Sequence, residues 1–141
     1  MVNSQSGLLG VSKISSDMRD LLERETQDVR AAEAMALFCY QVKKWIGAFA
    51  VALGGVDTLV FAGGVGENAP IVRARICDGL EFLGIELEEK RNATTEGVNS
   101  AETSRISVRV IRTDEESMIA STVCHVTGLT IEKEHDHENG V

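Results

Sequence analysis

The sequence predicts an α/β fold, because two short apolar strands each run into an amphipathic helix. The first strand covers 57–61 and precedes a helix that begins at Pro70, a position where the first helical turn tolerates a missing N–H. The second strand covers 106–111 and precedes a helix over 114–127. The third observation is a long helical pattern over 27–53, whose apolar stripe must be covered by another layer.

The 141 residues suffice for about one domain with its own core. They carry a net charge of -8, and the basic residues are scattered, which argues against nucleic acid or a membrane surface as a partner. The three cysteines lie far apart in helical patterns, so we expect buried thiols in a reducing, cytoplasmic setting. Charged residues interrupt the most apolar region, 29–53, so we expect no membrane span.

The N-terminal part is predicted to be irregular over 1–15 and helical afterwards. Ser16 is a good N-cap for a short helix whose first turn holds Asp17 and Asp20, where the helix dipole favours anions. The long helix follows and ends before the glycine pair at 54–55. Its apolar stripe repeats at steps of three and four residues and consists of Met35, Phe38, Cys39, Val42, Ile46, Phe49 and Leu53.

The junction after the first strand carries the strongest functional signal. Three glycines in Phe61-Ala62-Gly63-Gly64-Val65-Gly66-Glu67-Asn68 join the strand to the helix at Pro70. Glycine lets the backbone take a positive φ and approach a ligand closely, and the free N–H groups of a new helix favour an anion. A nucleotide is therefore the first candidate, although the order matches neither G-x-G-x-x-G nor a P-loop. A tight turn without a ligand is the alternative.

Downstream of this junction, the helix from Pro70 has apolar residues at helical spacing up to Leu83, and Gly84 serves as its C-cap. Residues 88–104 are charged and rich in small side chains, which predicts an exposed loop. Only two strands are convincing, and a stable sheet generally needs three or more. We therefore expect the sheet to continue in a segment or partner outside this chain.

The second strand-to-helix junction is acidic. In Thr113-Asp114-Glu115-Glu116, the spacing of Thr113 and Glu116 predicts a capping box. Glu115 is then left at the C-terminal end of a strand, where open α/β sheets bind ligands, and a carboxylate there can hold Mg²⁺. The alternative is that the acidic residues only complement the helix dipole.

A second candidate for ligand contact is Asp17-Met18-Arg19 at the start of the short helix. Arg19 can lay its planar guanidinium on a purine, and Met18 can supply an apolar wall. The alternative is an ordinary first turn with Arg19 in water. No serine, cysteine or histidine group assembles into a nucleophile with its base, so the chain shows no catalytic centre of its own.

Four motifs, taken in their order along the chain, resemble the acetate and propionate kinase family. They are Asn3-x-x-Ser6-Gly7-Leu8-Leu9-Gly10, Ser15-Ser16-Asp17-Met18-Arg19, Phe61-x-Gly63-Gly64-Val65-Gly66-Glu67-Asn68 and Thr113-Asp114-Glu115-Glu116-x-x-Ile119-Ala120. The resemblance covers residues 3 to about 129 and corresponds to the last third of a family member. It implies the ribonuclease H-like ATPase architecture of actin and sugar kinases, in which two α/β domains hold ATP in a cleft.

The resemblance also implies which residues bind the nucleotide and its metal. The adenosine pocket would be lined by Asp17, Met18 and Arg19, and Glu115 would ligate Mg²⁺. The loop that holds the nucleotide would be formed by Gly64, Val65, Gly66, Glu67 and Asn68.

By the same resemblance, residues 1–129 are the C-terminal part of a nucleotide-binding domain that lacks its first strands, and 130–141 form a polar disordered tail. The groups that hold the short-chain carboxylate and the transferred phosphoryl would lie outside this chain. We expect the ATP-binding part of a cytoplasmic, homodimeric acetate kinase, inactive as an isolated fragment. The alternative is a non-catalytic nucleotide-binding or dimerisation module, and a butyrate kinase-like relative is a lesser one.

Overall fold

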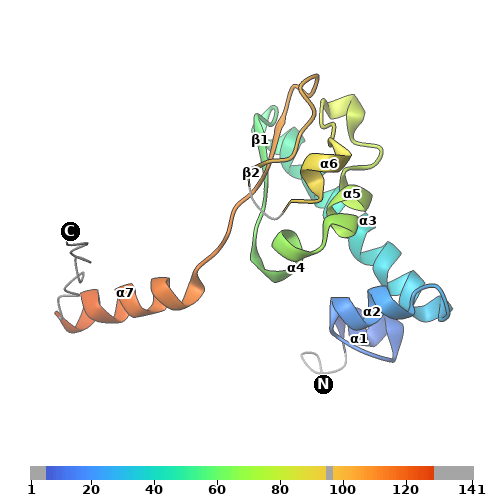
Figure 1. The fold of residues 1–141 in the computed structure, drawn as a ribbon, viewed down its shortest axis with the longest axis horizontal. Coiled ribbons are helices and arrows are strands. Elements are labelled where there is room, and N and C mark those ends of the chain that lie inside the picture. The colour runs from blue at the N-terminus through green and yellow to red at the C-terminus, as the bar shows by residue number, and fades with distance from the viewer. Residues whose placement is uncertain (1–5, 95–96, 129–141) are drawn as a thin grey trace, which may run out of the picture.

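The computed structural model describes residues 6–94 and 97–128. Helices pack beside one small sheet, and the last helix projects away from the rest (Figure 1). In chain order the elements are α1 (Gly7–Ser12), α2 (Met18–Arg24), α3 (Val29–Leu53), β1 (Thr58–Phe61), α4 (Gly63–Asn68), α5 (Pro70–Cys77), η1 (Glu81–Leu83), α6 (Glu89–Asn92), β2 (Gly97–Val98), β3 (Ser107–Val110) and α7 (Glu115–Thr127). The predicted mixed α/β class is therefore confirmed.

The sheet has three strands in the order β1-β3-β2. The two predicted strands, β1 and β3, pair in parallel from Thr58 opposite Ser107 to Phe61 opposite Val110. The third strand, β2, pairs antiparallel with β3 and was not predicted. This strand is two residues long and too short to show an alternating pattern. The residues that follow it, Asn99 and Ser100, are buried, and the N–H of Asn99 donates to the carbonyl oxygen of Val108. The prediction of an exposed loop over 88–104 is wrong in part: many of its side chains are exposed, but the segment contains α6 and β2, and Asn92, Asn99 and Ser100 are buried.

The N-terminal part is more regular than predicted within the described residues. Gly7–Ser12 forms α1, which packs against α3, so the helix depends on a distant partner that the local pattern does not show. The N-cap of α2 is Asp17 rather than Ser16, because the Asp17 carboxylate accepts a hydrogen bond from the N–H of Arg19 at 2.8 Å. Residues 1–5 lie outside the described part of the chain.

Helix α3 begins after Asp28 and ends at Gly54, close to the predicted bounds. The N-terminal half of its stripe is buried against α1, α2 and α5, as Met35 and Cys39 show. At the C-terminal end the stripe continues uncovered, with Phe49 59% and Leu53 77% exposed. By length and composition alone α3 could also cross a membrane, which is weak evidence because helices of soluble proteins pass the same test.

The predicted helix from Pro70 to Leu83 is interrupted. It ends at Cys77, and the chain turns at Gly79 with φ +76° before a short 3₁₀ turn. Cys39 and Cys77 are buried free thiols as predicted, whereas Cys124 is only half-buried. Burial raises the pKa of the Cys77 thiol to about 12, which keeps it protonated at neutral pH.

A buried guanidinium holds this part of the fold together. Arg73, in α5, is 0% exposed, and burial lowers its pKa. Its Nη1 donates to the carbonyl oxygens of Gly66 at 2.8 Å and Glu67 at 2.9 Å. Its Nε donates to Asn92 Oδ1 at 2.9 Å, and its Nη2 donates to the carbonyls of Asn92 and Thr94. The single side chain thus ties α4 to α6 and the turn that follows α6.

We predict that Arg73→Lys lowers the free energy of unfolding by about 2–4 kcal/mol, because lysine offers donors at one atom and leaves buried carbonyls unpaired. Urea unfolding followed by circular dichroism measures the change. The matched control is Arg30→Lys on the exposed side of α3, which should change stability by less than about 0.5 kcal/mol. Equal effects of the two substitutions would contradict the prediction.

Candidate functional site

The two strand-to-helix junctions lie side by side. Because β1 and β3 are parallel and in register, the residues that follow Phe61 and Val110 leave the sheet at the same edge. Glu67 of α4 bridges the two junctions. Its Oε1 accepts hydrogen bonds at 2.9 Å each from the N–H of Gly63 and from both the N–H and the hydroxyl of Thr113.

The glycine-rich segment is a short helix rather than an open loop. Gly63–Asn68 forms α4, and Gly63 has φ +71°, a conformation that favours glycine. The N–H of Gly63 is not free for an anion, because it donates to the Glu67 carboxylate. At Gly66 an added Cβ would lie 3.1 Å from the carbonyl carbon of Phe61, so this glycine lets α4 approach β1 closely.

The hydrogen bonds at Glu67 also set its protonation. The N–H of Thr113 lowers the pKa of this carboxyl most, followed by the Thr113 hydroxyl. Since the pKa in the folded chain lies below the ordinary value of 4.5, the ionised carboxylate stabilises the fold above that pH. This contribution is lost as the pH falls through the pKa of the folded state. At neutral pH the bridge is therefore fully formed.

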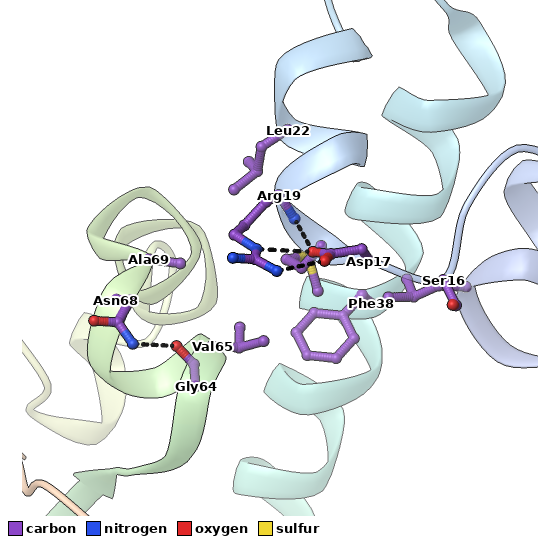
Figure 2. A pocket seen from close by; sticks show the side chains of 11 residues that line it. Ser16, Asp17, Arg19, Leu22, Phe38, Gly64, Val65, Asn68 and Ala69 are labelled. Atoms are coloured by element: carbon purple, nitrogen blue, oxygen red, sulfur yellow. Dashed lines mark hydrogen bonds and ion pairs between the residues drawn. The ribbon is translucent and has the colours of Figure 1, made fainter.

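An apolar cavity of about 760 Å³ opens between α2, α3 and α4 (Figure 2). On its α2 side, Arg19 Nη2 lies 2.7 Å from Asp17 Oδ2, and Arg19 Nε donates to Asp17 Oδ1 at 3.2 Å. This bond lowers the pKa of Asp17 and raises that of Arg19, and both side chains are solvated, so solvent screens the pair. The lining residues are Leu8, Ser16, Asp17, Met18, Arg19, Leu22, Phe38, Gly64, Val65, Asn68 and Ala69.

A polar cavity of about 590 Å³ lies on the other side of α4. Gly64 lines both cavities, so the two meet at this glycine. The predicted capping box of Thr113 and Glu116 is wrong, because Thr113 turns to Glu67, and Asp114 instead caps α7 by accepting from the N–H of Ser117 at 2.9 Å. The polar lining consists of Gly63, Gly64, Glu67, Arg112, Thr113, Asp114 and Glu116.

The structure brings most of the predicted ligand residues together, from segments far apart in the chain. The apolar cavity is lined by Asp17, Met18, Arg19, Gly64, Val65 and Asn68. Gly66 packs on β1 instead, and Glu67 lies in the polar cavity. The side chain of Glu115 lies outside the described part, although its backbone begins α7. Among the described side chains no group of three His, Cys, Asp or Glu residues could hold a metal ion.

Two contributors to the cavities were not predicted as site residues. Phe38 was assigned to the core through its place in the α3 stripe, yet its ring points into the apolar cavity (Figure 2). Arg112 adds a positive charge to the polar cavity and carried no motif signal. Periodicity alone cannot separate a core position from a cavity wall, because both lie on the same face of a helix.

Parallel strands that end at a glycine-rich segment, with cavities at their carboxyl edge, define an α/β protein of the kind that binds ligands at that edge. The sequence model of the acetokinase family matches residues 1–121. The chain therefore belongs to the acetokinase family, as its four motifs indicate.

Relatives of known sequence and structure agree with this. The chain is 47% identical over 126 residues to the acetate kinase of Solibacter usitatus, covering 85% of this chain and 30% of that protein. It is 50% identical over 125 residues to the acetate kinase of Clostridium botulinum, covering 85% and 31%. The chain thus spans about 30% of the length of these relatives.

Solved structures of related kinases match the fold of this chain over about a third of their own length. The Porphyromonas gingivalis acetate kinase aligns with a TM-score of 0.80 at 44% identity, covering 89% of this chain and 33% of that one. A propionate kinase from Francisella tularensis aligns with a TM-score of 0.77 at 36% identity, covering 85% and 31%. The similarity therefore extends to a part of each of these kinases.

We predict opposite responses for two neighbouring glycines of α4. Gly66→Ala should lower the free energy of unfolding by about 1–2 kcal/mol, because the new Cβ would press on the Phe61 backbone. Gly64→Ala serves as the control and should change it by less than about 0.5 kcal/mol or increase it, since nothing lies within 4 Å and alanine favours helix. Thermal and urea unfolding measure both, and equal losses would refute the close packing of α4 on β1.

Proposed function

We propose that this chain is the ATP-binding part of an acetate kinase and binds an adenine nucleotide across its two cavities. The observation that carries the proposal is that Gly64 lines both an apolar and a polar cavity. A ligand with an apolar base and an anionic tail matches this arrangement. The backbone between the two ends has no side chain at Gly63 and Gly64, so a ligand can approach it closely.

The apolar cavity suits a purine ring. Met18, Phe38 and Val65 offer apolar surface to a flat ligand. The guanidinium of Arg19 hydrogen-bonds to the Asp17 carboxylate beside this cavity. A planar cation can stack on an aromatic base, so Arg19 is placed to contact a bound purine.

The polar cavity suits phosphates with a divalent cation. Arg112 supplies positive charge, whereas Asp114 and Glu116 add negative charge that a bound cation would balance. Magnesium, when bound, would neutralise phosphate charge, which matters in a chain of net charge -8. By the family resemblance, Glu115 is the residue that would hold it.

Transfer to acetate would need further groups. Phosphoryl transfer depends on positioning from both sides of a cleft, and the chain spans about 30% of the length of its relatives. The edge of β1 away from β3 pairs with no strand in the described part, and the apolar face of α7 is exposed at Met118, Ile119, Val123 and Val126. We infer that a further chain segment covers these surfaces and supplies the carboxylate site of a cytoplasmic, actin-like kinase.

A second candidate function is assembly without catalysis. On α3, Tyr40 is 60%, Trp45 57% and Phe49 59% exposed, and the rings of Trp45 and Phe49 stack with centroids 5.8 Å apart. Exposed aromatic clusters of this kind favour an interface, and a second copy of the chain would give a homodimer. The assembly function and the nucleotide function use different surfaces, so a measurement of nucleotide binding distinguishes them.

We expect the full chain to bind ADP with Mg²⁺ and Arg19→Ala to weaken this binding about three- to tenfold, because a stacking cation at the cavity is lost. Titration with fluorescent ADP measures the affinity. Arg24→Ala at the other end of α2 is the control and should bind as the unaltered chain does. If no ADP binds at any concentration while the chain forms dimers, the assembly function stands alone.

We further expect no acetyl phosphate from the chain with ATP, Mg²⁺ and acetate, because one side of the cleft is absent. A hydroxamate assay measures the product against a boiled sample. Product clearly above the boiled sample would show that the described residues suffice for transfer and would refute this part of the proposal.

A further inference from the structure

We propose that Glu67 is a positioning residue that clamps the two strand-to-helix junctions and thereby sets the geometry between the apolar and polar cavities. It acts on the ligand through the backbone it holds, not by contact with the phosphates. The family resemblance places Glu67 in the nucleotide loop as a binding residue, so this is a different role. Its effect on affinity rests on the proposed nucleotide function, whereas the clamp itself does not.

The contacts of Glu67 reach both junctions from one atom. Oε1 accepts from Gly63 in the β1–α4 junction and from the N–H and hydroxyl of Thr113 in the β3–α7 junction. The residue is 9% exposed, so water competes little for these bonds. Hydrogen bonds from neutral donors to an ionised carboxylate are stronger than those between neutral groups. A single charged oxygen therefore draws the two junctions together.

The clamp continues the sheet beyond the point where its ladder ends. The last backbone bond between the strands runs from the N–H of Ile111 to the carbonyl oxygen of Phe61 at 3.0 Å. After this bond, the segment that follows β1 turns into α4 and the segment that follows β3 runs toward α7. The hydrogen bonds of Glu67 join these two segments beyond the point where they diverge. They thereby fix the wall that Gly64 and Thr113 share in the polar cavity.

The backbone of Glu67 is itself held from the opposite side. The buried Arg73 guanidinium donates to the carbonyl oxygens of Gly66 and Glu67, so the start of the side chain has a fixed position. The carboxylate of Glu67 therefore contacts Thr113 from a fixed backbone position. This arrangement transmits the rigidity of the Arg73 network to the β3–α7 junction.

The cap of α7 does not depend on the clamp. Asp114 accepts from the N–H of Ser117, whereas the N–H and hydroxyl of Thr113 donate to Glu67. Substitutions at Thr113 can therefore loosen the clamp and leave the helix cap in place. This separation allows a test in which the two roles do not interfere.

The linings of the two cavities indicate which ligands should bind more weakly when the clamp is loosened. The apolar cavity is lined by residues 8–69, so adenosine alone would touch only the α2, α3 and α4 side. ADP with Mg²⁺ would also reach the 112–116 segment that lines the polar cavity. A looser clamp should therefore weaken ADP with Mg²⁺ and spare adenosine.

The experiment compares adenosine with Mg²⁺-ADP by calorimetry on the full chain. Glu67→Gln should weaken Mg²⁺-ADP about tenfold, since a charged acceptor becomes neutral, and change adenosine less than about twofold. Thr113→Val should weaken Mg²⁺-ADP about threefold and Thr113→Ser should restore it. Glu33→Gln on the exposed side of α3 is the control with the same charge change. Equal losses for both ligands would overturn the proposal.

A second measurement needs no ligand. In amide NMR spectra, Glu67→Gln should shift the N–H signals of both Gly63 and Thr113 and leave that of Ser117 in place, because only the first two donate to Glu67. Unmoved Gly63 and Thr113 signals would refute the clamp. If the unaltered chain binds neither ligand, the proposed function fails and these shifts alone decide the clamp. If Glu67→Gln does not fold, the Thr113 pair gives the decision.

Discussion

Parallel pairing of β1 and β3 places Phe61 opposite Val110 and so brings both strand-to-helix junctions to one edge of the small sheet. The register is held by a core in which Val72 and Ile76 of α5 lie in one buried cluster with Val108 and Val110 of β3. Without this pairing, the glycine-rich segment and the acidic segment would have no common surface. The polar cavity therefore depends on strand pairing as much as on the glycine motif.

Two charged side chains hold α4 in place from opposite sides. Buried charges are costly unless they are hydrogen-bonded, and both Glu67 and Arg73 meet this condition through backbone groups. The positive charge of Arg112 also lowers the pKa of the Glu67 carboxyl. A helix between two such anchors has little freedom to move, which suits a surface on which a ligand must be positioned closely.

The surfaces that lack a partner are as informative as the cavities. The aromatic end of α3 and the apolar face of α7 are exposed, and α7 projects away from the sheet (Figure 1). Both are helices whose apolar pattern is typical of a covered face. The chain spans about 30% of the length of its relatives. Under the proposed function, nucleotide binding does not require phosphoryl transfer, because transfer needs groups on both sides of the phosphates.

The sequence by itself determined α3, β1 and β3, because apolar spacing, end caps and glycine junctions are local signals. The family also followed from local motifs. Tertiary structure decided the pairing of β2, the place of Phe38 in the cavity wall and the bonds from Thr113 to Glu67. Each of these depends on contacts between residues far apart in the chain, which no local pattern records.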